Sequence, residues 1–306
     1  MILCCGEALI DMIPTDDGSA FAPIAGGSVF NTAIGLGRQG APVSLVSGVS
    51  NDLFGVVLTD ALSASNVGTD HLVRSDRPTT LAFVKLVDGK ASYAFYDENT
   101  AGRLLEKSDM PQSLPADVDA LFFGGISLAV EPCADTYLDF LARNASDKLT
   151  MVDPNIRPSF VQDEARFRTR MDQIISHCDI VKISDDDLEW FDTSSGSLAD
   201  KAASLIAKGP KLICLTKGSE GVEVHDANGL RAQAKPSPKE VVDTVGAGDA
   251  FSAGFLTSLH RSESLSKSAI AAISDADLQA AIDFATAFSA DTVTRKGSDP
   301  AWNYQA

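Results

Sequence analysis

Short, continuous apolar runs alternate with amphipathic stretches along most of this chain. Six of the runs are brief and partly β-branched, which is typical of strands buried on both faces: MILCC, VSLVSGV, DALFFGG, KLTMVD, DIVKIS and KLICLT. Stretches with apolar residues at helical spacing lie between several of them, at residues 28–39, 53–65, 132–145, 165–176 and 198–208. The alternation predicts a single α/β domain over residues 1–306, with helices on both faces of a doubly wound, mostly parallel sheet.

Two segments break this rhythm, residues 8–25 and residues 79–96. In the second, TTLAFVKLVDGKASYAFY has two β-rich arms around the turn DGK, which predicts a hairpin. With no helix between these strands, we expect a small separate sheet, formed by segments of about 8–25 and 79–102. Such a sheet would be a lid over the carboxyl ends of the main strands, where open α/β sheets bind ligands. The alternative is a hairpin that extends the edge of the main sheet.

The composition permits a large core and limits the partners. The chain has 306 residues, 44% of them hydrophobic, and 42 acidic against 25 basic residues give a net charge of −17. This charge repels nucleic acid and anionic membranes, so an anionic ligand needs a local site built for it. We therefore expect neither nucleic acid nor a membrane among the partners.

The five cysteines and the first residues predict a soluble cytoplasmic protein. There is no CxxC pair, and most of the cysteines lie in or beside apolar runs, so we expect buried, reduced thiols, with metal or redox roles as the alternative. The start MILCCGEALI has no basic region, and no later stretch reaches the ~18 apolar residues that a membrane span requires.

The segment DTVGAGDAF, residues 243–251, places a run of small residues before a helical pattern at 250–262. Gly246, Ala247 and Gly248 then lie at a helix start, where unpaired amides favour negative charge. A carboxylate at Asp249 would repel a bound phosphate, but it suits a general base that takes the proton of an attacking hydroxyl. The amides would stabilise the phosphoryl group in transit. The alternative is that Asp249 only caps the helix.

Two long motifs carry a resemblance to a known family. DTVGAGDAFSAGF, residues 243–255, resembles the C-terminal signature of the ribokinase-like (PfkB) carbohydrate kinases, and GGSVFNTAIGLGRQGAPVSLVSGVSND, residues 26–52, resembles their N-terminal signature. The resemblance implies a three-layer ribokinase-like fold with a β lid, and transfer of the ATP γ-phosphoryl group to a sugar hydroxyl. It implies a catalytic base at Asp249, an anion hole at Gly246, Ala247 and Gly248, and sugar contacts from Asp11, Gly27 and Asn31.

The same resemblance implies a nucleotide site. TKGSEG, residues 216–221, resembles the family's T-x-G-x-x-G segment, which places Thr216, Gly218 and Gly221 at ATP, with a plain glycine turn as the alternative. VKISDDDLEW aligns with the family's N-x-x-E element, which helps to position Mg²⁺ and phosphate. Here Ser184 replaces the asparagine and Asp187 the glutamate, and a solvated acidic helix start is the alternative.

Two further glycine-containing segments bear on the ligands. Family members commonly bind a monovalent cation such as K⁺ through backbone carbonyls, and the matching positions are Asp243, Val245, Arg295 and Gly297. GLGRQG, residues 35–40, fits the dinucleotide pattern G-x-G-x-x-G but lies inside a helical stretch, so we do not expect NAD.

The choice of sugar depends on two segments, YAFYDENTAGRLL and DPNIRPSF, which resemble the bacterial fructokinase and 2-keto-3-deoxygluconate kinase branch. Tyr93, Phe95 and Tyr96 are expected to cover the sugar, or else only to pack within the lid. A kinase of acidic sugars would be expected to carry an arginine after the lid tyrosine, where Asp97 would instead repel the acid. Arg157 could favour an anion or tie its loop to Asp153.

We therefore expect a fructokinase that converts D-fructose to fructose 6-phosphate, with a 2-keto-3-deoxygluconate kinase as the alternative. A sugar-binding regulator that has lost catalysis is the alternative from another class. A homodimer through the lid is a further possibility.

Overall fold

Most of the chain is built around one large mixed sheet. The computed structural model describes residues 1–15, 17–87, 90–237 and 239–305. Within this part the sheet has the order β14-β13-β12-β11-β10-β9-β1-β4-β5, with β6 also paired to β4. The strands are β1 (Ile2–Cys5), β4 (Val43–Ser50), β5 (Val67–Gly68), β6 (Leu72–Ser75), β9 (Ala120–Gly124), β10 (Leu149–Asp153), β11 (Ile180–Ser184), β12 (Leu212–Thr216), β13 (Val222–Asp226) and β14 (Gly229–Ala234).

The pairing of these strands confirms the predicted parallel sheet. The pairs from β5 through β4, β1, β9, β10 and β11 to β12 are parallel, whereas β12, β13 and β14 are joined by antiparallel pairing at the other edge. Each of the six apolar runs forms one of the strands. The glycines of GLGRQG lie in and just after a helix, as expected.

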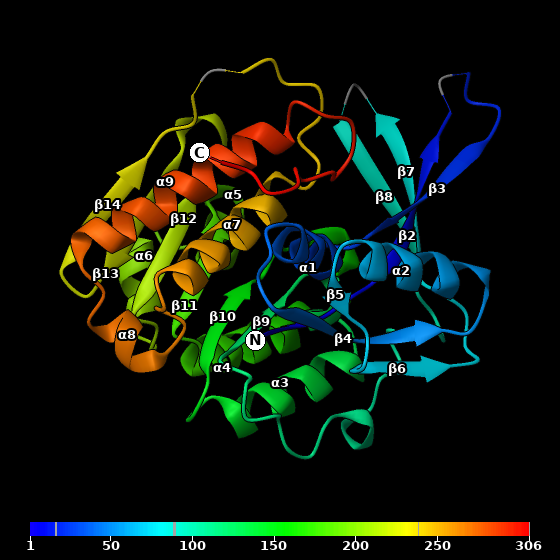
Figure 1. Ribbon diagram of the computed structural model, residues 1–306, viewed down its shortest axis with the longest axis horizontal. Coiled ribbons are helices and arrows are strands. Elements are labelled where there is room, and N and C mark those ends of the chain that lie inside the picture. Colours follow the sequence, from blue (N-terminus) through cyan, green and yellow to red (C-terminus); the bar gives the residue numbers. More distant parts are fainter. Residues whose placement is uncertain (16, 88–89, 238, 306) are drawn as a thin grey trace.

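Helices cover both faces of the sheet (Figure 1). Alternate strand residues supply two cores: Ile2 and Cys4 belong to one, and Leu3 and Cys5 to the other. The first core is covered by α1 (Ser28–Arg38), α2 (Leu53–Ala64), α7 (Ala247–Arg261), α8 (Lys267–Ala271) and α9 (Asp275–Thr292). The second core is covered by α3 (Cys133–Asn144), α4 (Glu164–His177), α5 (Asp185–Phe191) and α6 (Leu198–Ile206).

A second, smaller sheet projects from one side of the molecule (Figure 1). Its order is β3-β2-β7-β8, built from β2 (Leu9–Pro14), β3 (Phe21–Gly26), β7 (Leu81–Val87) and β8 (Lys90–Tyr96). Both segments that break the α/β rhythm therefore join in one separate sheet, which rules out a simple extension of the main sheet. Of the predicted turn DGK, Asp88 and Gly89 lie outside the described residues.

The cysteines Cys4, Cys5, Cys133, Cys178 and Cys214 are buried and free of disulfides. In the described ranges, no helix has both the length and the apolar character needed to cross a membrane.

Candidate active site

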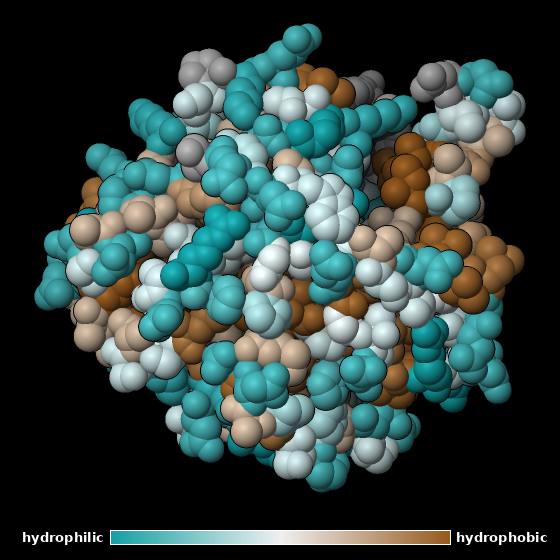
Figure 2. Space-filling model, in the orientation of Figure 1, coloured by the Kyte–Doolittle hydropathy of each residue, from teal (hydrophilic) through white to brown (hydrophobic). Residues whose placement is uncertain are grey.

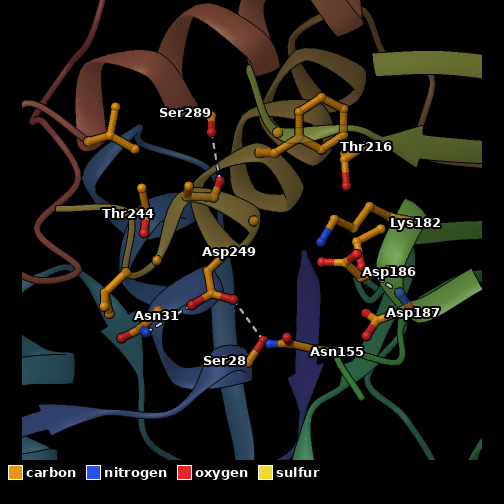
Figure 3. Close-up of a pocket in the computed structure, with 18 of the residues that line it drawn as sticks. Ser28, Asn31, Asn155, Lys182, Asp186, Asp187, Thr216, Thr244, Asp249 and Ser289 are labelled. Atoms are coloured by element: carbon orange, nitrogen blue, oxygen red, sulfur yellow. Dashed lines mark hydrogen bonds between the residues drawn. The ribbon is translucent and has the colours of Figure 1, made fainter. Parts of the chain in front are cut away.

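A cavity of about 1100 Å³ lies where the carboxyl ends of the main strands meet the small sheet. It is lined by the ends of β11 and β12, the segment after β10, the starts of α1 and α7, and residues of β2 and β8. Cavities that hold drug-sized ligands measure about 300–1,000 Å³, so this one lies at the upper end of the range for binding sites. Figure 3 shows the polar side chains that converge on it.

The cavity collects most of the residues expected to form the site. The lining includes Asp11, Gly27, Asn31, Tyr93, Phe95, Arg157, Ser184, Asp187, Thr216, Gly218, Gly221, Val245, Gly246, Ala247, Gly248 and Asp249. Tyr96, Asp243, Arg295 and Gly297 are not part of the lining.

At the start of α7 the Ala247 N–H, predicted to be open, instead donates to the Thr244 carbonyl at 3.3 Å, whereas the next two amides are open. Gly246 precedes the helix with φ 78°, and a Cβ there would come 2.2 Å from the Ser298 hydroxyl oxygen, so the position requires glycine. Gly248 and Asp249 belong to the first turn, where the helix itself offers no acceptor for backbone N–H groups. Their amides are therefore available to an anion in the cavity.

The Asp249 carboxylate is held by the first turn of α1. The Ser28 hydroxyl donates to Oδ1 at 2.7 Å, and the Asn31 amide donates to Oδ2 at 2.9 Å (Figure 3). Burial raises the pKa of Asp249 to about 6, although the hydrogen bonds from Asn31 and Ser28 lower it. The two motifs, far apart in sequence, thus meet in one contact, and Asn31 is seen to orient the carboxylate.

Two more carboxylates line the cavity near Asp249. Burial raises the pKa of Asp11 to about 7, with further contributions from the charges of Asp249 and Glu7. Glu7 is buried and accepts hydrogen bonds from the backbone N–H groups of Ser28, at 3.0 Å, and Ser127, at 3.3 Å. Sequence reasoning missed Glu7 and Ser28; the signal for Glu7 was a lone acid inside an apolar stretch.

Of the three lid aromatics, Tyr96 does not face the cavity, which corrects the prediction. Tyr93 and Phe95 line the cavity with stacked rings 5.8 Å apart. Tyr96 is 64% exposed and packs edge-on against Phe83, with ring centroids 5.3 Å apart. Successive residues of a strand point to opposite faces, so Tyr96 cannot share the face of its neighbour Phe95.

Asp97 does not face the cavity, so its expected repulsion of an acidic substrate is wrong. It is buried outside the cavity lining, where its carboxylate accepts from the Thr80 hydroxyl at 3.0 Å. Its other oxygen lies 3.5 Å from the Arg103 guanidinium. The charge is thus compensated within the protein.

Arg157 lines the cavity, but it does not tie its loop to Asp153. Its guanidinium donates to the Asn155 side-chain oxygen at 2.7 Å and to the Ile156 carbonyl at 3.2 Å. Asp153 pairs instead with Lys182, at 2.8 Å. Lys182, which lines the cavity, is a third residue that sequence reasoning missed.

The other end of the cavity contains the expected nucleotide residues. The Ser184 hydroxyl accepts from the Asp187 backbone N–H at 3.0 Å and caps α5. Burial raises the pKa of Asp187 to about 6, with the Asp153 charge as a further cause. Thr216 ends β12, and after it Gly218 and Gly221 have φ values of 52° and 102°. A Cβ at Gly221 would come 2.0 Å from the Ala234 carbonyl, so this turn also requires glycine.

The two loops expected to hold a monovalent cation lie side by side next to the start of α7. The Asp243 carboxylate accepts from the backbone N–H groups of Val245, at 3.0 Å, and Gly297, at 2.9 Å. The Gly297 carbonyl accepts from Asp299 at 3.0 Å, and the Arg295 side chain points to Asp291, 2.7 Å away. Only Val245 of the four residues reaches the cavity.

Comparison with known proteins places the chain in a family. Residues 1–303 match the family described as pfkB family carbohydrate kinase. A fructokinase of Rhizobium leguminosarum bv. trifolii is 46% identical over 91% of this chain and 86% of its own length. The structure of a Xylella fastidiosa fructokinase with bound ATP superposes with a TM-score of 0.90 at 27% identity, covering 97% of this chain and 93% of that one.

A fructokinase of Vibrio cholerae O395 shares the fold, with a TM-score of 0.86 at 24% identity over 97% of this chain and 93% of that one. The fold is therefore ribokinase-like, and the chain belongs to the pfkB family of carbohydrate kinases.

Proposed function

We propose that this protein is a fructokinase that transfers the γ-phosphoryl group of ATP to the terminal hydroxyl of D-fructose, giving fructose 6-phosphate. The position of Asp249 carries the proposal, because a buried carboxylate stands beside open helix amides between the two ends of one large cavity. The 46% identity to the Rhizobium fructokinase supports fructose as the sugar.

Each step of the proposed transfer is assigned to particular residues. Asp249, oriented by Ser28 and Asn31, takes the proton of the sugar hydroxyl, and the hydroxyl oxygen forms a bond to the γ-phosphorus. The bond from that phosphorus to the bridging oxygen breaks, and ADP leaves with the electron pair. The amides of Gly248 and Asp249, presented by the turn at Gly246 and Ala247, hold the charge on the phosphoryl group.

The sugar end is built to bind a polyol. Carboxylates accept hydrogen bonds from hydroxyls and amides donate to them, so Asp11 and the amides near Gly27 suit this ligand. Tyr93 and Phe95 cover it from the small sheet, and Arg157 and Asn31 complete the wall.

ATP would be bound by Ser184, Asp187, Thr216, Gly218 and Gly221, which line the other end. In the part of the chain that the structure describes, no group of three or more His, Cys, Asp or Glu side chains is placed to hold a metal ion. Mg²⁺ usually binds through one or two carboxylates, several waters and substrate phosphates, so the Asp187 carboxylate fits it. When bound, Mg²⁺ would neutralise charge on the phosphates of ATP.

K⁺ would be bound by backbone carbonyls of the loops at 243–245 and 295–297. The Asp243 carboxylate holds these loops together, which suits a site made of main-chain oxygens. A cation there would add positive charge behind the start of α7.

One observation favours an acidic sugar as the second candidate. Arg157 lies at the sugar end of the cavity, and Asp97, being buried elsewhere, does not oppose a carboxylate. A 2-keto-3-deoxygluconate kinase is therefore the alternative substrate class.

An ATP-consumption assay with fructose, ribose, 2-keto-3-deoxygluconate and adenosine tests the proposal. We expect kcat/KM to be highest for fructose, by at least ~10-fold over the acid, which is the scale of losing one well-made contact. The Asp249→Asn protein, purified in parallel, controls for contaminating kinases. Preference for the acid would overturn the choice of sugar, and no turnover with any substrate would favour a sugar-binding regulator.

The lid region also carries an apolar patch that suits a homodimer. Leu53, Val56 and Val57 at the start of α2 and Phe21 and Ile24 on β3 are exposed, and the two elements are in contact. Figure 2 shows apolar side chains gathered here, beside the small sheet. Patches of this kind mark interaction sites in soluble proteins.

We expect light scattering to give twice the mass of the chain, and Val56→Glu to give the mass of a monomer; an unchanged mass in Val56→Glu would contradict a dimer through this patch.

A further inference from the structure

Lys182 is a buried cation in the middle of a strand. On β11 it shares a face with Ile180, which packs into the core beneath α7, while Val181 and Ile183 pack into the opposite core. Its ammonium donates to Oδ2 of Asp153 at 2.8 Å, and the two side chains are 6% and 1% exposed. The strand alternation thus directs Lys182 towards the start of α7.

Stability of the fold does not by itself explain this buried ion pair. Buried ion pairs are often no more stabilising than apolar side chains of similar volume, because both charges lose their water. Oδ1 of Asp153 is buried without a hydrogen-bond partner among the described residues, which adds to the cost. Burial lowers the pKa of Lys182, but the attraction of Asp153 outweighs it and leaves the pKa raised. The ammonium therefore stays charged at neutral pH.

Lys182 lies against the amides that face the cavity. A Cβ placed on Gly248 would come 2.8 Å from its ammonium nitrogen. Figure 3 shows the side chain pointing into the space in front of Asp249. The other cations in the lining are engaged elsewhere: Arg157 bonds to its own loop at the sugar end, and Lys239 lies 3.3 Å from Asp291.

We propose that the Lys182 ammonium contacts the γ-phosphoryl group of ATP during transfer and is a catalytic residue, with Asp153 as the residue that positions it. This rests on the proposed phosphoryl transfer. As the bond from the sugar oxygen to phosphorus forms and the bond to the bridging oxygen breaks, the proton passes to Asp249 and ADP takes the electron pair. Lys182 keeps its proton and, with the amides of Gly248 and Asp249, counters the charge on the phosphoryl oxygens.

The test replaces Lys182 alone and together with its partner. Lys182→Met removes the charge and keeps most of the length of the side chain, but it leaves Asp153 buried and unpaired. The double variant Asp153→Asn/Lys182→Met removes both charges and so protects the fold. Lys267→Met is the matched control, because Lys267 also pairs with a largely buried aspartate, Asp179, at 2.7 Å but does not line the cavity.

We expect Lys182→Met and the double variant to lower kcat by about 10- to 100-fold, with the KM for the sugar within ~3-fold, and Lys267→Met to stay within ~2-fold of wild type. Circular dichroism and thermal unfolding report whether each variant is folded. If Lys182 only neutralises Asp153, the double variant recovers to within ~3-fold of wild type, which overturns the proposal.

A binding measurement separates this proposal from the choice of sugar. Isothermal titration with ADP, alone and with aluminium fluoride as a mimic of the phosphoryl group in transit, needs no turnover of fructose. We expect Lys182→Met to weaken binding of ADP with aluminium fluoride at least ~10-fold more than binding of ADP alone. Equal effects on both would overturn the role of Lys182, whereas failure to turn over fructose in the wild type would overturn only the proposed substrate.

Discussion

Asp249→Asn is expected to lower kcat at least ~100-fold while fructose and ATP still bind, because loss of a positioned general base costs about 10²- to 10⁴-fold. Asparagine keeps the shape of the side chain and an oxygen for one of the hydrogen bonds from Ser28 and Asn31. It cannot take the proton of the sugar hydroxyl. Steady-state kinetics with both substrates varied will show whether the loss is in kcat.

The same variant should not be less stable. The pKa of Asp249 is raised from 3.8 to about 6 by burial, so the folded state holds its proton between these values and stability falls as the pH rises through that window. At neutral pH the ionised carboxylate of the wild type therefore lowers the free energy of unfolding by roughly 3 kcal/mol. Asparagine removes this penalty but loses one of the two hydrogen bonds, which offsets part of the gain. We expect the melting temperature to remain equal or to rise, which separates lost chemistry from lost folding.

The pH profile and a matched variant complete this test. In wild type, kcat/KM should fall about tenfold per pH unit below about pH 6, because only the ionised carboxylate accepts a proton. Asp277→Asn is the control, since Asp277 is also in the first turn of a helix but does not line the cavity. An Asp249→Asn enzyme within ~3-fold of wild type would remove Asp249 from the role of base.

The main sheet could be predicted from the sequence because its strands are buried on both faces and therefore read as continuous apolar runs. β10 and β11 are examples, each buried along nearly its whole length. The small sheet could be recognised because its strands follow one another without a helix. The face of the small sheet on which each aromatic side chain lies is harder to predict. Tyr93, Phe95 and Tyr96 are similar residues close in sequence, but the two-residue period of a strand places Tyr96 on the face opposite Phe95.

The motifs predict the start of α7, but not the residues that form hydrogen bonds around it. Ser28 and Glu7 act through hydrogen bonds to residues distant in sequence, which a local pattern does not reveal. Lys182 lies within a run that predicts a buried strand, and its partner Asp153 ends the neighbouring strand. A charge inside an apolar run was the available signal. Asp97 shows the converse, because its position in a motif indicates a contact with the ligand, whereas the fold places its carboxylate beside Arg103.

Gly248→Ala is expected to lower kcat at least ~100-fold without unfolding the protein. In the first turn of α7, alanine is the better helix former by up to ~1 kcal/mol, so the local backbone gains from the change. The added methyl would come 2.8 Å from the Lys182 ammonium and would stand where a phosphoryl oxygen must approach the amides. The long side chain of Lys182 can move aside, but the phosphoryl group then loses both contacts, and loss of one such donor costs about 10²- to 10³-fold.

Thermal unfolding and kinetics together decide the outcome for Gly248→Ala. We expect a melting temperature within a few degrees of wild type, since 1 kcal/mol shifts it by roughly 2–4 °C in a chain of this order of size. Gly102→Ala is the control, because a Cβ there meets no atom closer than 3.6 Å and the residue does not line the cavity. If Gly248→Ala kept full kcat, the phosphoryl group would have to be held by atoms other than the amides of this turn, and the mechanism built on the start of α7 would fail.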